Sequence, residues 1–319
     1  MAYPHRDRQR SRLMDRPNYP VDNPFVTLKA RWLLVGFFAI SMGLGLGMII
    51  LGSLRLLPIQ VGDPILAPVL YILVFTSLCG LIVTQRRFPT LHLQDLMGPP
   101  PWHLAWLQLL WLVVGVFLFS VGAFQVSYLG LSWVAPHLVE ATLQQSRLLL
   151  ADQSANPRLY NGLMLFSVVV VAPVTEEFLF RGILFHRWAV KWGVRTAMVM
   201  TSILFGLLHS NLIGLFVFGV VMSLLYLTTR SLLVPIAAHA LNNALASALD
   251  YAAIRASPST PIHTLAEFQA NWWLGIVCLL VSAPWVLRYV VYHWPTAVTP
   301  LPYFVNQRQR LGCEGSEAS

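Results

Sequence analysis

The chain has 319 residues, of which 56% are hydrophobic and only 11% are charged. This composition excludes an ordinary soluble globular domain and predicts a membrane protein with several spanning helices. A net charge of +8 could also suit a nucleic-acid-binding protein, but the distribution of the basic residues fits membrane topology instead. We therefore expect the lipid bilayer, and no nucleic acid, as a partner of this chain.

Apolar runs of about 17–25 residues mark the helices expected to cross the bilayer. They predict an all-α, polytopic membrane helical bundle with about eight transmembrane helices, two of which form a short hairpin. The longer runs lie near residues 32–54, 65–83, 104–128, 163–187, 231–254 and 272–292, and the short pair lies near 196–209 and 212–227.

The segments around these runs complete the predicted organisation. Two polar tails, which are rich in Arg and Pro at the start of the chain and in Gly, Ser and Glu at its end, are expected to be disordered. The predicted parts are a basic tail at 1–28, N-terminal membrane helices with an outer loop at 29–162, a central membrane core at 163–254, a C-terminal loop and helix at 255–305, and a second tail at 306–319.

The positions of Lys and Arg predict how the helices are oriented. If the amino terminus lies inside, sixteen of the 21 basic residues fall in inner segments, four fall in outer segments, and Arg181 lies within a helix. An excess of Lys and Arg in cytoplasmic loops is the usual pattern in membrane proteins. We therefore expect an integral, multi-pass membrane protein with both termini in the cytoplasm.

Two adjacent acids, Glu176 and Glu177, lie inside the fourth long apolar run. An acid at the bilayer centre costs roughly 2.5–3.5 kcal/mol on insertion scales, so the pair needs partners or a wet cavity. Glu177 and Arg181 are one helical turn apart and are expected to form an ion pair. Glu176 points about 100° away and is free for chemistry. Pro173 is expected to kink the helix and free the carbonyl of about residue 169.

Further polar side chains are expected at similar depths. The first helix of the short hairpin rises about 21 Å, less than the roughly 30 Å hydrocarbon core, so its tip at residues 209–211 is predicted to end inside the membrane. Non-helical backbone at that depth must be shielded by protein or line a water-filled cavity. In the following run, His239 and Asn243 share one helical face. We expect Glu176, His209 and His239 to converge.

Water activation is the chemistry that suits these side chains. A carboxylate and an imidazole can each take a proton from water, while His and Asn N–H groups can stabilise an oxyanion, and together these steps hydrolyse an amide. Alternatively, Glu176, His209 and His239 could hold a divalent metal such as Zn. Structural roles are also open, because buried polar residues often form hydrogen bonds between membrane helices. A proton-coupled transporter is a more distant alternative, but no inverted repeat is found.

Three motifs follow one another on successive predicted helices. They are EExxxR at 176–181, FxxxH from Phe205 to His209, and HxxxN from His239 to Asn243. Together they resemble the motifs of the CPBP family, which contains CAAX prenyl proteases and bacteriocin-processing (Abi) intramembrane proteases. The resemblance covers residues 163 to about 250, which makes 163–254 a CPBP-like catalytic core.

The resemblance implies an intramembrane endopeptidase acting on a membrane-associated or small peptide substrate. It leaves the metal open, because the family has been described both as metalloproteases and as metal-independent glutamate proteases. The substrate could be lipidated, and the basic tail and family subtype favour a bacterial cell membrane. A non-catalytic immunity or scaffold protein on the same fold is the alternative function. The resemblance implies that Glu176 is the acid–base catalyst and that His209 activates water. It implies that His239 and Asn243 form the oxyanion site. Glu177 and Arg181 would shape the site and balance its charge.

Overall fold

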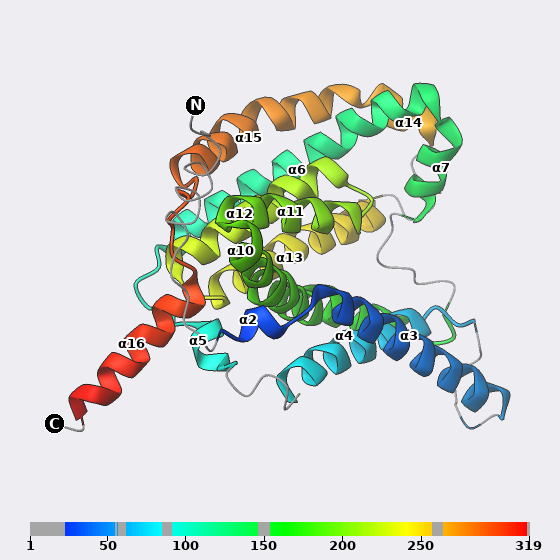
Figure 1. Cartoon of the computed structure of the whole chain (residues 1–319). Helices are drawn as coiled ribbons and strands as arrows, with labels where there is room; N and C mark the ends of the chain where they lie inside the picture. Colours follow the sequence, from blue (N-terminus) through cyan, green and yellow to red (C-terminus); the bar gives the residue numbers. More distant parts are fainter. Residues whose placement is uncertain are drawn as a thin grey trace, which may run out of the picture.

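The computed structural model describes residues 23–54, 56, 62–84, 91–145, 154–256 and 264–317, and every regular element within these ranges is a helix (Figure 1). The prediction of an all-helical membrane bundle is therefore confirmed. Six helical stretches in the described ranges are long and apolar enough to cross a membrane. They are α3 (Ala30–Ser53), α4 (Leu66–Thr84), α6 (Trp106–Val134), the continuous stretch Pro157–Trp192, α12 (Leu212–Thr229) and α15 (Trp272–Tyr292).

Two further helices lie where the remaining two of the eight predicted spans were expected, but neither is among the six candidate spans. Helix α11 (Val194–Leu207) is apolar but has only 14 residues. Helix α13 (Leu233–Ala256) has 24 residues and carries the polar HxxxN motif among its apolar positions. Helix α12 has 18 residues and rises about 27 Å. The two helices of the hairpin therefore differ in length more than the sequence indicated.

The stretch Pro157–Trp192 changes its winding several times. It comprises α8 (Pro157–Phe166), the π-helix η1 (Ser167–Val171), α9 (Ala172–Glu177), the π-helix η2 (Phe178–Leu184) and α10 (Phe185–Trp192). π-Helical segments are rare and are frequently found at functional sites. The two acids of the candidate site therefore lie between two widened turns of one helix.

The first π-helix explains how the chain accommodates Pro173. The N–H of Ala172 bonds to the carbonyl of Ser167, five residues back. In the same register the carbonyl of Val168 faces position 173, where proline has no N–H. The freed carbonyl is thus that of Val168, one residue from the predicted position at about residue 169, because the π-helical register is one residue longer than the α-helical one.

The tip of the hairpin is fixed by close packing and by a capping residue. A Cβ atom on Gly206 would lie 2.6 Å from the carbonyl oxygen of Leu212, so this tight return requires glycine. Asn211 caps α12 by accepting a 3.1 Å hydrogen bond from the N–H of Gly214, and its Nδ2 donates to the carbonyl of Ser120 in α6 at 2.8 Å. These bonds hold the polar tip against the bundle.

The predicted disorder of residues 23–28 is wrong. Helix α2 (Pro24–Thr27) begins there, and the ring of Phe25 is fully buried and stacks on His186 with a centroid distance of 4.8 Å. Arg187 also donates a 2.9 Å hydrogen bond to the carbonyl of Phe25. Burying one Phe side chain stabilises a fold by about 1.5–3 kcal/mol, which is enough to anchor a short segment. Residues 1–22 lie outside the described part of the chain.

The second tail is also helical where it is described. Helix α16 covers Pro302–Glu317, and the guanidinium of Arg310 binds both carboxylate oxygens of Asp95 at 3.0 and 2.9 Å. Asp95 belongs to the short helix α5 (Leu93–Met97). The expectation of disorder at 306–317 therefore fails, because this polar segment has a bidentate partner more than 200 residues away in the sequence.

Candidate functional site

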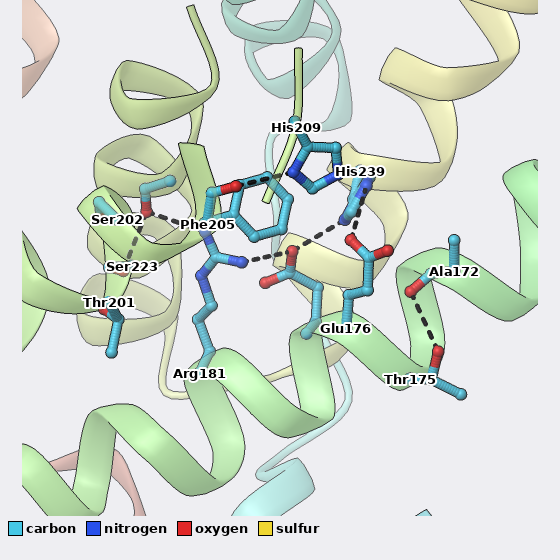
Figure 2. Close-up of polar contacts among 12 residues, drawn as sticks. Ala172, Thr175, Glu176, Arg181, Thr201, Ser202, Phe205, His209, Ser223 and His239 are labelled. Atoms are coloured by element: carbon cyan, nitrogen blue, oxygen red, sulfur yellow. Dashed lines mark hydrogen bonds and ion pairs between the residues drawn. The ribbon is translucent and has the colours of Figure 1, made fainter. Parts of the chain in front are cut away.

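A cavity of about 420 Å³ brings together α4, the long helix, the hairpin tip and α13. Four of the predicted site residues line it: Glu176, His209, His239 and Asn243. Figure 2 shows the side chains of Glu176, His209 and His239 pointing toward one another, from the long helix, the turn between α11 and α12, and α13. The expected convergence of the three motifs is thus present in the structure. The roles of these residues in catalysis stay a prediction.

The other two predicted residues, Glu177 and Arg181, lie behind the cavity. Their ion pair is 2.9 Å long, and both side chains are almost completely buried. Arg181 also donates to the carbonyl of Gly219 at 3.0 Å and lies over the ring of Phe205, 4.9 Å from its centroid. The predicted partner of Glu177 is therefore correct, and the charge of Arg181 is balanced by a carboxylate, a carbonyl and an aromatic face.

Glu177 also fixes the orientation of His239. Its Oε1 atom lies 2.9 Å from Nδ1 of His239, which requires an N–H at Nδ1 if the carboxylate accepts the bond. The other ring nitrogen, Nε2, then faces Glu176 across 4.0 Å. This arrangement is the usual way in which a carboxylate selects one tautomer of a functional histidine.

The two oxygens of Glu176 have different surroundings. Oε1 accepts a 2.7 Å hydrogen bond from the hydroxyl of Tyr71, while Oε2 is buried without a partner among the described residues. The 4.0 Å between Oε2 and Nε2 of His239 is too long for a direct hydrogen bond and is a distance that a water molecule can bridge. In Glu176, Oε1 is therefore fixed by Tyr71, while Oε2 forms no hydrogen bond with a described residue.

Tyr71 is the site residue that sequence reasoning missed. It lies on α4, 105 residues before Glu176, and it lines the same cavity. The available signal was weak: a tyrosine about 9 Å inside an apolar run, whereas Tyr usually lies at the ends of membrane spans. Sequence alone gives no reason to pair it with the acid.

His209 and Asn243 are each held in place by one hydrogen bond to a backbone carbonyl. Nδ1 of His209 lies 2.7 Å from the carbonyl of Phe205, so Nδ1 carries the hydrogen and Nε2 is free to accept a proton. Nδ2 of Asn243 donates a 2.8 Å hydrogen bond to the carbonyl of Val168, the one freed by Pro173. Within the described part of the chain, the second hydrogen on Nδ2 of Asn243 has no acceptor.

The proposed metal ligands do not form a complete set in this arrangement. Glu176 and His239 approach each other to 4.0 Å. However, no group of three or more His, Cys, Asp or Glu side chains in the described ranges is placed to hold a metal ion, so His209 does not complete the set. The residues as placed do not fit a three-ligand centre, and we derive no reaction step through a metal.

Residues 158–245 match the family described as type II CAAX prenyl endopeptidase Rce1-like. The chain is also 33% identical over 84 residues to a Bacillus subtilis protein named "Putative membrane peptidase YdiL". That match covers 25% of this chain and 34% of the relative, so the chain spans about a third of the relative's length. No solved structure matches. The residues of the three motifs fall within the matched segment, whereas Tyr71 lies outside it.

Proposed function

We propose that this chain is an intramembrane endopeptidase of the CPBP type in which Glu176 and His209 activate water, because its central core matches the Rce1-like family and resembles a Bacillus membrane peptidase. The observation that carries the proposal is the shared cavity, which is lined by Glu176 from the long helix, His209 from the hairpin tip and His239 from α13. A carboxylate oxygen that has no hydrogen-bond partner among the described residues and lies in one cavity with two imidazoles is a suitable general base.

The proposed reaction is general acid–base hydrolysis. Glu176 takes a proton from a water molecule that also hydrogen-bonds to Nε2 of His209, and the water oxygen attacks the carbonyl carbon of the peptide bond. The second amide hydrogen of Asn243, and an N–H at Nε2 of His239 when that ring is doubly protonated, stabilise the oxyanion. Glu176 then returns its proton to the peptide nitrogen, the C–N bond breaks, and an acid and an amine leave.

The proposal also includes the orientation of the protein, the membrane that holds it and its substrate. The excess of basic residues in the predicted inner segments supports cytoplasmic termini. The similarity to a Bacillus protein supports a bacterial cell membrane. The substrate would be a peptide or protein held in or at the bilayer, with or without a lipid group.

The test is cleavage of a panel of lipidated and unlipidated peptides by the purified full-length protein in detergent. Glu176→Gln and His209→Ala are each expected to lower kcat about 10²- to 10⁴-fold. Glu140→Gln, which changes an exposed acid on α7 (Pro136–Gln145), is the control and should keep full activity. No cleavage of any peptide, or cleavage that is the same with Glu176→Gln, would leave the enzyme proposal unsupported and favour a non-catalytic scaffold.

Adding a chelator to the same cleavage assay tests whether a metal is required. The proposed mechanism predicts undiminished cleavage by the wild-type protein in EDTA or phenanthroline. Activity lost with the chelator and restored by Zn²⁺ would show that a metal completes the site in a different arrangement of His209.

A further inference from the structure

A second cavity, of about 590 Å³, lies between α6, α12 and α15 and shares no lining residue with the candidate active site. Figure 1 shows α6 and α15 running alongside each other. Their backbones approach closely at Gly122, where a Cβ atom would lie 2.7 Å from the carbonyl oxygen of Gly275. The cavity lies toward the opposite ends, where α6 begins and α12 and α15 end.

The lining changes from polar to apolar along the helices. Polar side chains from His103, Gln108, Thr229 and His293 lie at or near the helix ends. Apolar side chains lie deeper, and Leu112 is about 9 Å along α6 from its first residue. The positive-inside pattern places this end of the bundle at the cytoplasmic membrane surface. A cavity that is polar at the surface and apolar below it matches the shape of an amphiphile.

The ionisable side chains that line the cavity include basic residues and no acidic one among the described residues. Arg288 is exposed and faces the cavity together with His103 and His293, and no carboxylate is among the described residues that line it. The His293 ring is held by a 2.9 Å contact from Nδ1 to the carbonyl of Tyr289, and it packs on the Tyr289 ring at a centroid distance of 4.3 Å. Nε2 of His293 is therefore available to a ligand. Cations at a membrane surface attract anionic headgroups.

We propose that this cavity binds one anionic phospholipid of the bilayer. Its phosphate would lie at Arg288, and the upper part of an acyl chain would lie along Leu109, Leu112 and Trp285. The volume is within the range that proteins use for amphiphilic ligands of this size. The proposal is independent of the hydrolytic function, because none of these residues lines the site of Glu176.

The experiment uses full-length protein in detergent and measures retained lipid by native mass spectrometry. Phosphatidylglycerol and phosphatidylcholine with identical acyl chains are the two probes. The wild-type protein should retain one phosphatidylglycerol under conditions that remove phosphatidylcholine. Arg288→Gln should weaken retention of phosphatidylglycerol about fivefold, the factor expected for one cation near an anionic headgroup, while Arg288→Lys should keep most of it.

Two further variants test whether the lipid binds in this cavity or at any part of the protein surface that contacts lipid. Gln108→Trp fills the rim of the cavity without changing the charge and should lower retention of phosphatidylglycerol. Arg158→Gln removes an exposed cation at the start of α8, away from the cavity, and should have no effect. Equal retention of both lipids by the wild-type protein, full retention by Gln108→Trp, or equal losses in Arg158→Gln and Arg288→Gln would overturn the proposal. Thermal unfolding of each variant in detergent excludes misfolding as the cause.

Discussion

The hydroxyl of Tyr71 donates a 2.7 Å hydrogen bond to Oε1 of Glu176 and thereby connects α4 to the two acids of the long helix. The bond occupies one carboxylate oxygen and leaves Oε2 for the cavity. Since α4 lies outside the segment matched by the family, the candidate site is completed by a part of the chain that the shared motifs do not include. If Glu176 is the general base, Tyr71 is its positioning residue.

We expect Tyr71→Phe to lower kcat about 10- to 100-fold while KM stays nearly constant. Hydrogen bonds to charged groups are worth about 1.5–3 kcal/mol, and here the bond orients the base without contacting the substrate. The measurement is steady-state cleavage of the best peptide substrate. Tyr251→Phe, at an exposed tyrosine of α13, is the matched control. A Tyr71→Phe protein with wild-type kcat would show that Glu176 is oriented without this bond.

The buried ion pair of Glu177 and Arg181 gives a second prediction. Glu177→Gln leaves Arg181 with its charge buried and without its carboxylate, and breaking a buried pair in this way typically costs about 3–5 kcal/mol. Thermal unfolding in detergent should therefore show a large loss of stability. The double variant Glu177→Gln/Arg181→Met removes both charges and should regain most of that stability.

Activity should not return with stability in the double variant, because His239 still lacks the carboxylate that holds its Nδ1 atom. The same preparations measured for peptide cleavage test this point. Recovery of both stability and cleavage would mean that the pair only balances charge and does not orient His239.

The parts of the site that sequence reasoning could predict are local ones. The ion pair of Glu177 and Arg181 follows from the helical repeat, and so does the common face of His239 and Asn243. The spans follow from runs of apolar residues, because the bilayer sets their length. The polar tip at His209 follows from the same comparison of helix length with bilayer thickness.

The parts that could not be predicted depend on distant packing or on a rare backbone form. The bond from Tyr71 to Glu176 joins residues 105 positions apart, and no local pattern encodes such a pairing. Composition predicts disorder for the two tails, but it does not reveal that Phe25 or Arg310 has a specific partner. The π-helical register before Pro173 shifted the freed carbonyl by one residue, because sequence rules assume α-helical geometry.

Asp63 gives a prediction about pH. Its carboxylate accepts hydrogen bonds from the backbone N–H groups of Ile65 at 2.9 Å and Ala155 at 3.0 Å and from the hydroxyl of Ser154 at 2.9 Å, which ties the start of α4 to the segment before α8. These bonds, with that of Ile65 the largest cause, lower the pKa of Asp63 below its ordinary value. The ionised form is thus favoured in the folded protein.

A lowered folded pKa means that Asp63 contributes stability above its unfolded pKa and that this contribution is lost as the pH falls through the folded pKa. We expect Asp63→Asn to be less stable than wild type at neutral pH, with the difference shrinking below about pH 4. Thermal unfolding in detergent between about pH 3 and pH 7 is the measurement. Glu140→Gln, at an exposed acid, serves as control, and a difference that stays constant across this range would contradict the prediction.

The last prediction concerns the bond from Nδ2 of Asn243 to the carbonyl of Val168. Asn243→Ala leaves that carbonyl without its partner, and an unsatisfied buried group costs about 1–3 kcal/mol. Pro173→Ala restores an N–H at the position that this carbonyl faces in the π-helical register. The double variant Asn243→Ala/Pro173→Ala should therefore recover the thermal stability lost in the single Asn243 variant.

Cleavage separates the two uses of Asn243. If its second amide hydrogen stabilises the oxyanion, the double variant should be stable yet reduced in kcat by about 10²- to 10³-fold. Pro235→Ala, at another proline of the site helices, is the matched control and should restore no stability to Asn243→Ala. Recovery of kcat together with stability would limit Asn243 to supporting the helix at Val168 and would leave His239 as the donor to the oxyanion.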